Sequence, residues 1–346
     1  MSTNTTIDAV RQQNQQATLS QKDVDLATLD GFQLPVDVTE EFLERMQEEI
    51  SILGLADTMT LPRLEMRVPQ FGVPILSGSA RDEEASRTSN SAVDSGYVKF
   101  NATDQSYYIL VEPERDALKN THYGPDQFGD YIVDQFIQRW GNDAGLIGIR
   151  ANASSGNLQS IGGDADLDAT WNGWLAIAEG SDSVSDRIGL EDTAAGELTT
   201  MPAVDMTSAP PDTQMFNDTI QKLDPRFRNS DQVEPVFLMS PNKLQEYVYS
   251  LTEREDALGS AVVMGDSDIT PFDYTVIGVN GWPDSYVMFT DPSNLAFGLF
   301  EQMEVDQTTD TDKVHENRLH SRNWMEGQFD FQIKELQAGV LVQNIG

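Results

Sequence analysis

The sequence predicts an α+β protein, and three observations support this class. Apolar residues recur at intervals of three or four in segments 37–55 and 123–151, which is the spacing of one helix face. Short runs of β-branched and aromatic residues lie between 61 and 115 and again after 234, which is typical of strands. With 346 residues, 39% of them apolar, the chain is long enough to bury a core.

The N-terminal part predicts an arm followed by a helix. Residues 1–36 are rich in Gln, Asn and Thr and hold no apolar run of signal-peptide type, so we expect an extended, mobile arm. In segment 37–55, Asp37 and Glu40 have the spacing of a capping box, and Gly54 is a suitable C-terminal stop. We therefore expect a helix there.

Residues 61–115 combine strand-like runs with a polar middle. Val98, Phe100 and Ala102 alternate with polar positions, which predicts a strand with one buried face. Segment 78–96 contains almost no apolar residue, and long structureless loops within a domain are uncommon. We interpret it as the tip of a projecting hairpin; a disordered loop is the alternative.

Segment 123–151 predicts a long helix. Pro125 lies where a first helical turn accepts proline. Gly145 and Gly148 lower helix propensity and would let another backbone approach closely. The apolar side chains that repeat every four residues are Phe128, Ile132, Phe136 and Trp140.

The rest of the chain is expected to be loop-rich from 154 to 212 and then mixed. Two aromatic residues, Trp171 and Trp174, could stack on a sugar ring, but we expect them to anchor a packed loop. Beyond these, the pattern predicts helices 212–228 and 240–259 and strands 234–240, 272–279, 286–290 and 295–300.

Charge is the strongest compositional signal. Asp plus Glu number 57 and Lys plus Arg number 22, which gives a net charge of −35. In ordinary salt the acidic side chains would repel one another and destabilise the folded state. At molar salt the Debye length falls to about 3 Å, which screens most of this repulsion. The acid-rich, Lys-poor composition resembles that of proteins from extreme halophiles; an acidic protein of ordinary salt is the alternative. The sequence contains no stripe rich in Lys and Arg that would predict nucleic-acid binding.

Motifs for catalysis or metal binding are scarce. The chain has no cysteine and only three histidines, which excludes thiol chemistry and leaves little for zinc. His315 and His320 are interpreted as surface residues of a strand. Asp164, Asp166 and Asp168 resemble the start of a calcium loop, but the Gly and Glu that such a loop needs at its sixth and twelfth positions are replaced. We predict no catalytic residue, cofactor or metal.

Two stretches of the sequence resemble a known family. They are "FLMSPNKLQEYVYSLTEREDALG" (237–259) and "YTVIGVNGWPDSYVMFTDPSNLAFGLFEQMEV" (274–305). Together with the order of arm, helix, polar hairpin, long helix and α/β region, they resemble the major capsid proteins of tailed viruses, which have the Hong Kong 97-type fold. The acidic composition suggests a virus of a halophilic archaeon.

The resemblance implies a division of the chain. The turn at 291–294 would join the last strand of an axial domain to the first strand of a peripheral domain. The implied parts are an N-terminal arm (1–36), the peripheral domain's first part (37–70), an extended loop (71–108), the peripheral domain with its spine helix (109–153), an axial domain (154–295), a long peripheral hairpin with its turn at 306–313 (296–334) and a return to the axial domain (335–346).

The resemblance also implies a function. Copies would assemble into the pentamers and hexamers of an icosahedral shell that encloses double-stranded DNA without a basic patch, in a virion assembled in the host cytoplasm. The implied partners are a portal and scaffold, protease or decoration proteins, with no membrane. The residues expected at contacts between subunits are Arg81, Glu83, Glu84, Arg87, Asp310, Asp312 and Lys313.

Two alternatives remain open from the sequence. One is an encapsulin-like protein compartment, which would share the fold. The other is a halophilic hydrolase that uses an Asp/Glu pair between residues 160 and 300, because no feature singles out one pair among so many acids.

Overall fold

The computed structural model shows an α+β chain that forms two compact units. Unit 1 comprises Met1–Pro35, Tyr108–Gln135 and Gln302–Glu326, and unit 2 comprises Val36–Tyr107, Phe136–Glu301 and Gly327–Gly346. No helix in the described part of the chain is both long and apolar enough to cross a membrane. The residues that the structure describes are 32–33, 52–69, 97–103, 105–112, 114, 140–152, 170–180, 187–188, 200–228, 233–252, 271–301, 304–308, 311–319 and 321–346.

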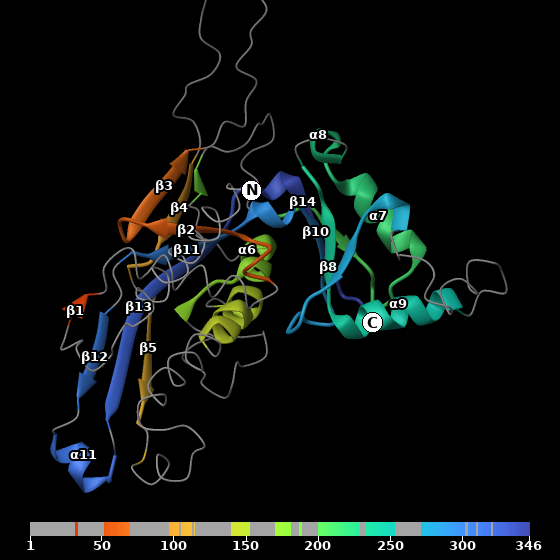
Figure 1. The fold of residues 1–346 in the computed structure, drawn as a ribbon. Coiled ribbons are helices and arrows are strands. Elements are labelled where there is room, and N and C mark those ends of the chain that lie inside the picture. Colours follow the sequence, from red (N-terminus) through yellow and green to blue (C-terminus); the bar gives the residue numbers. More distant parts are fainter. Residues whose placement is uncertain are drawn as a thin grey trace, which may run out of the picture. The chain divides into compact units, whose positions relative to one another are not determined.

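A five-stranded sheet forms one part of unit 2 (Figure 1). The three central strands pair antiparallel, and both outer strands pair parallel with their neighbours. In spatial order the strands are β7 (Ala203–Asp205), β14 (Gly339–Gln343), β10 (Val287–Thr290), β8 (Val236–Met239) and β9 (Val276–Gly278).

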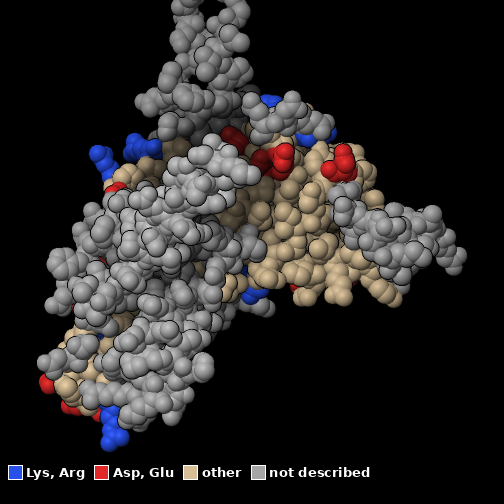
Figure 2. All heavy atoms as spheres, in the orientation of Figure 1, with Lys and Arg blue, Asp and Glu red and all other residues tan. Residues whose placement is uncertain are grey.

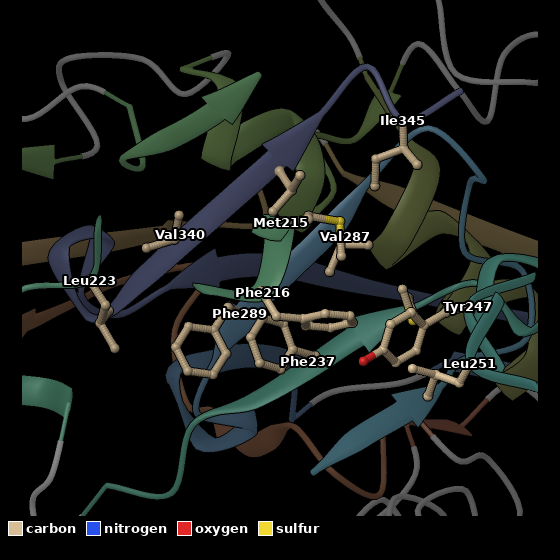
Figure 3. Packing of buried hydrophobic residues seen from close by; sticks show 12 residues of the cluster. Met215, Phe216, Leu223, Phe237, Tyr247, Leu251, Val287, Phe289, Val340 and Ile345 are labelled. Carbon is tan, nitrogen blue, oxygen red and sulfur yellow. The ribbon is translucent and has the colours of Figure 1, made fainter. Parts of the chain in front are cut away.

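Helices α7 (Thr213–Lys222) and α9 (Pro241–Thr252) contribute to the core on this sheet. Asp212 caps α7 by accepting a hydrogen bond from the Met215 amide at 2.7 Å. Figure 3 shows how the aromatic rings gather, with Phe237 and Phe289 stacked at 4.1 Å between their centroids. The predicted helix 212–228 is divided, because α7 ends at Lys222 and a separate short helix, α8 (Pro225–Arg228), follows.

A second sheet in unit 2 joins segments far apart in the sequence. Strand β2 (Asp57–Leu61) pairs parallel with β11 (Leu295–Phe300), which pairs antiparallel with the C-terminal part of β13 (Arg322–Ile333). Strand β5 (Ser106–Val111) also pairs with β13. Gly298 leaves room for its neighbours, since an added Cβ atom would lie 2.8 Å from the Leu61 side chain.

The strands β3 (Glu65–Pro69), β4 (Tyr97–Asn101) and β6 (Arg187–Ile188) form a third sheet. The predicted buried face is confirmed, because Val98, Phe100 and Ala102 are each at most 2% exposed. Strands β3 and β4 pair antiparallel as far as Pro69 and Tyr97. Segment 70–96, which would form the hairpin tip, lies outside the described residues.

Residues 140–150 are helical, which confirms that part of the predicted long helix. Gly148 has its space filled by Phe331 and Trp174, and an added Cβ atom on Gly173 would lie 2.5 Å from the Gly148 carbonyl oxygen. The expectation for Gly148 is therefore wrong in its partner: side chains occupy the space at Gly148, and Gly173 is the glycine that lets another backbone approach closely.

Helix α6 (Trp174–Glu179) corrects the expectation of a loop-rich stretch. The indole of Trp171 donates to the Phe329 carbonyl at 3.0 Å, and that of Trp174 donates to the Ala296 carbonyl at 3.1 Å. Both rings are buried, so they anchor packing as expected and present no surface to a sugar.

In unit 1, β12 (Glu304–Thr308) lies between β1 (Phe32–Gln33) and the N-terminal part of β13. The expected turn at 306–313 is wrong in its bounds, because β12 continues to Thr308 and a short helix, α11 (Asp312–Glu316), follows. His315 lies on this helix and not on a strand. The sequence missed α11 because five residues are too few to show helical periodicity.

The turn at 291–294 leads from one sheet to another. Asp291 accepts a hydrogen bond from the Ser293 amide at 2.8 Å, and Pro292–Asn294 form a short 3₁₀ helix, η3. Strand β10 before it belongs to the five-stranded sheet, whereas β11 after it pairs with β2 and β13. The two apolar strands that flank this turn therefore belong to different sheets.

Candidate interaction surfaces

Two of the seven residues expected at contacts are described. Asp312 and Lys313 are both exposed, on the first turn of α11. The other five, Arg81, Glu83, Glu84, Arg87 and Asp310, lie outside the described residues. The role of all seven in contacts stays a prediction.

Helix α11 forms a charged surface on a small apolar base. Val314 is fully buried, and its carbonyl accepts a hydrogen bond from the Leu319 amide at 2.9 Å. The remaining side chains of the helix are exposed, and Figure 2 shows both acidic and basic groups where Figure 1 places α11. Burial of one apolar residue fixes the segment and leaves its charges available to a partner.

A stacked aromatic pair lies on the sheet of unit 1. The rings of Tyr108 and Trp324 are parallel within 1°, with centroids 4.8 Å apart, although Tyr108 is 66% exposed. Trp324 lies directly opposite Asp306 across β12 and β13. Arg322 makes an ion pair with Glu112 at 2.6 Å at the side of the stack. The sequence analysis missed this pair, which only the register between distant strands brings together.

Like charges meet on the same sheet face. Glu304 lies directly opposite Glu326, and both are exposed, as is Asp306 two residues along β12. Like charges placed opposite each other across a strand pair destabilise the sheet. We define the acidic aromatic face as Tyr108, Trp324, Glu304, Asp306 and Glu326.

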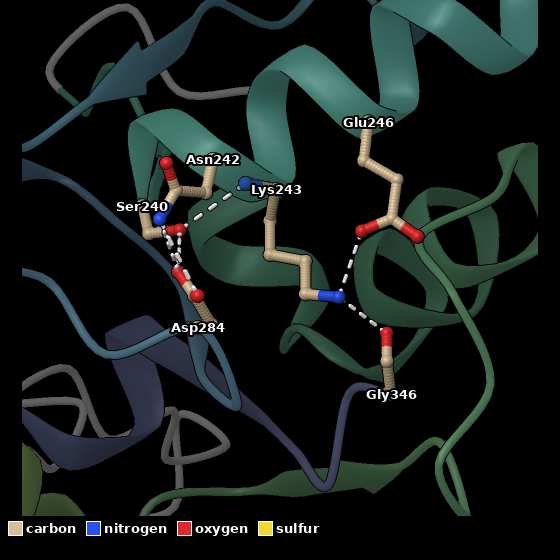
Figure 4. A network of polar contacts seen from close by, with 6 residues as sticks. All are labelled: Ser240, Asn242, Lys243, Glu246, Asp284 and Gly346. Atoms are coloured by element: carbon tan, nitrogen blue, oxygen red, sulfur yellow. Dashed lines mark hydrogen bonds and ion pairs between the residues drawn. The ribbon is translucent and has the colours of Figure 1, made fainter.

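A polar network holds the start of α9 (Figure 4). Ser240 accepts a hydrogen bond from the Lys243 amide at 3.2 Å and donates its own hydroxyl to Asp284. The Lys243 ammonium pairs with Glu246 at 2.7 Å and also donates to the main-chain oxygen of Gly346. All of these contacts join residues of the same subunit, so we interpret the network as stabilising the subunit.

Three basic residues lie at the end of α7 and in α8: Lys222, Arg226 and Arg228. Arg228 donates to the carbonyls of Gln221 and Leu223 at 2.8 and 2.9 Å and so satisfies the end of α7. Burial raises the pKa of Asp224, but hydrogen bonds from Arg226 outweigh it, and the pKa lies below its ordinary value.

The described residues offer little for catalysis. Within them, no group of three or more His, Asp or Glu side chains is arranged to hold a metal ion. Burial raises the pKa of Tyr107 above its ordinary range, and this hydroxyl sits in the core against Gly327.

Comparison of the structure with solved structures gives several matches in fold. A chain of the satellite phage P4 procapsid, determined with its size determination (Sid) protein, matches with a TM-score of 0.63 and 13% identity over 100% of this chain and 98% of that one. The chain has the fold of phage capsid proteins. A chain of the native GTA particle capsid matches with a TM-score of 0.58 and 12% identity, over 86% of this chain and 90% of that one.

The capsid of cyanophage A-1(L) gives a similar result, with a TM-score of 0.54 and 11% identity over 85% of this chain and 92% of that one. No protein-family model and no curated protein matches the sequence. At these identities the likeness concerns the fold. It confirms the resemblance to phage capsid proteins at that level.

Proposed function

We propose that this protein is the major capsid protein of a tailed virus that infects a halophilic archaeon. Its copies form pentamers and hexamers, and these close into an icosahedral shell around double-stranded DNA. The observation that carries the proposal is the match to the P4 procapsid chain, which extends over nearly the whole length of both chains. Because this match extends along the full chain, we infer that the chain also has the elements that a shell subunit would use for contacts.

The mechanism is repetition of weak contacts under symmetry. When two different surfaces of identical subunits bind each other, the subunits form a ring if repeating the rotation between neighbours leads back to the first subunit. Each contact then adds to the next, as linked binding sites do. Function therefore resides in surfaces such as α11 and the acidic aromatic face, and it needs no catalytic group.

High salt is part of this mechanism. A charge of −35 on each subunit opposes close packing of copies at low ionic strength. At 1 M salt the Debye length of about 3 Å confines this repulsion to direct neighbours. Phosphate contacts lose most of their free energy under the same conditions, so the shell would confine DNA without binding it.

The implied division of the chain completes the proposal. The arm (1–36), the extended loop (71–108) and the long hairpin (296–334) would reach neighbouring subunits, and the axial domain (154–295) would surround the five-fold and six-fold axes. A portal protein, and scaffold, protease or decoration proteins, would act with the subunit in the host cytoplasm.

Electron microscopy of the purified protein tests the proposal. We expect closed particles of megadalton mass at molar salt. A small oligomer under these conditions would overturn the proposal and favour the hydrolase. Particles that hold a peptide-tagged cargo protein and never a genome in infected cells would favour the encapsulin-like compartment.

A further inference from the structure

The acidic aromatic face of unit 1 is an exposed sheet surface with two components. The Tyr108–Trp324 stack supplies apolar area, since Tyr108 is 66% exposed. Around it lie three exposed carboxylates, Glu304, Asp306 and Glu326, two of them directly opposite each other. An isolated subunit gains nothing from this arrangement, because like charges across a strand pair destabilise the sheet.

The outer face of β3 and β4 in unit 2 has the opposite charge. Arg67 lies directly opposite Lys99 across the two strands, and Arg63 is exposed just before β3. Glu65 makes an ion pair with Lys99 at 3.1 Å and is the acid on this face. Figure 2 shows basic side chains gathered where Figure 1 places β3 and β4. We define the basic hairpin face as Arg63, Arg67 and Lys99.

A cluster of basic residues is unexpected in a chain with so few of them. Acids outnumber bases 57 to 22, yet here two cations meet directly opposite each other in neighbouring strands. The basic face keeps an excess of positive charge although Glu65 pairs with Lys99, and the acidic face carries Glu304 opposite Glu326, so the charges of the two faces are complementary.

We propose that the acidic aromatic face of one subunit binds the basic hairpin face of a second copy of this chain. The inference deepens the proposed function and rests on it, since it names the surfaces through which neighbours in the shell meet. The occupant is a second copy because the charges of the two faces are complementary and both belong to this chain.

The two components have different roles at high salt. Complementary charges set register and exclude wrong partners more than they add affinity, and salt weakens them at a distance. Burial of the aromatic stack is not screened by salt and supplies free energy in proportion to the apolar area removed from water. At molar salt, apolar burial would maintain the affinity of such a contact, and the complementary charges at short distance would maintain its specificity.

Charge reversal tests the contact. Glu304→Lys with Glu326→Lys should abolish particles, and so should Arg63→Glu with Arg67→Glu, while each subunit stays folded by circular dichroism. All four substitutions together should restore particles. The matched control combines the two acidic-face substitutions with Lys222→Glu and Arg226→Glu, which restores the same net charge at a different place. This control should form no particles.

Rescue by the control as well as by the matched set would mean that net charge alone matters and would overturn the inference. Normal particles from the two acidic-face substitutions alone would overturn it too. If the wild-type protein itself forms no particles, the proposed function fails first. The two failures are therefore distinguishable.

A disulfide test separates contacts between copies from contacts within one copy. The natural chain has no cysteine, so introduced pairs react only with each other. Arg67→Cys is combined in turn with Glu304→Cys, Asp306→Cys and Glu326→Cys. After oxidation of particles, at least one pair should give covalent multimers on a non-reducing gel, which each single cysteine variant should not give. Monomers alone from all three pairs would overturn the inference.

Discussion

Asn294 and Glu335 bind each other through two hydrogen bonds. The side-chain amide of Asn294 donates to the Glu335 carbonyl at 2.8 Å, and the Glu335 amide donates to the Asn294 side-chain oxygen at the same distance. Asn294 is only 6% exposed, and it also donates to the Thr290 hydroxyl at 3.1 Å. The turn between β10 and β11 is thereby fastened to the connection between β13 and β14.

We predict that Asn294→Ala lowers the free energy of unfolding by about 1–3 kcal/mol, because it removes the side-chain acceptor of the partly buried Glu335 amide and one of the donors to the Glu335 carbonyl. Urea unfolding at fixed salt, followed by circular dichroism, measures this. Ser293→Ala is the control, since Ser293 is exposed, and it should stay within about 0.5 kcal/mol of the natural protein. Equal stability of the two variants would contradict the prediction.

Gly298→Ala should destabilise the subunit by about 1–3 kcal/mol, the usual cost of overpacking a core. Its Cβ atom would lie 2.8 Å from Leu61 and 3.0 Å from Phe100, both of which are buried. Gly278→Ala is the matched control, because the nearest atom there is the end of the Leu244 side chain at 3.3 Å. Thermal unfolding compares them, and a control as damaging as Gly298→Ala would refute the packing argument.

The raised pKa of Tyr286 leads us to predict that the folded protein loses stability at alkaline pH. Burial, the hydrogen bond to Glu179 at 2.7 Å and the charge of Glu179 raise the pKa of Tyr286 from 10.0 to about 12. Because the folded state favours the neutral phenol, this stabilisation is complete below pH 10 and is lost as the pH rises through 12.

The melting temperature of the natural protein should therefore fall more steeply between these pH values than that of Tyr286→Phe. Tyr249→Phe replaces a tyrosine that is 64% exposed and should follow the natural protein. Parallel curves for all three proteins would show that the Tyr286 phenol makes no such contribution.

Shells should loosen when salt is diluted well below molar. The Debye length grows to about 10 Å at 0.1 M, so repulsion among subunits of charge −35 extends beyond direct neighbours. Light scattering during dialysis measures particle mass, and returning the salt serves as the control for reversible loosening. Particles that stay intact in dilute buffer would refute the adaptation to high salt.

Deletion of residues 78–95 should leave a folded subunit that cannot close particles. Strands β3 and β4 stay paired up to Pro69 and Tyr97, and the residues left between them are enough to close a shorter hairpin. Thermal unfolding checks that the subunit is folded, and electron microscopy counts particles. Normal shells from this variant would exclude a role for the segment in closure.

Local patterns predicted the local elements well. Val98, Phe100 and Ala102 are buried because strand side chains alternate between faces, and this alternation is visible in the sequence. The start of α7 follows from Asp212, whose side chain accepts from a free amide of the first turn. Both signals act over a few residues, so one sequence is enough to find them.

Long-range pairing could not be predicted in the same way. The parallel register of β2 on β11 places Asp57 opposite Ala296, and no local signal encodes a partner so far along the chain. The Tyr108–Trp324 stack has the same origin, because it depends on how β5 meets β13. Sequence patterns therefore could not predict the acidic aromatic face, because its residues come from strands that are far apart in the sequence.

The order of the strands has a consequence for synthesis on the ribosome. Strand β2 leaves the ribosome early, but its partner among the described strands is β11, and β14, between β7 and β10, is made later still. We therefore expect the sheets that contain β2 and β7 to keep open strand edges until β11 and β14 emerge, and to be completed after most of the chain has been made. Under the proposed function, a truncated product that lacks β11 or β14 would lack complete surfaces and would be excluded from a growing particle.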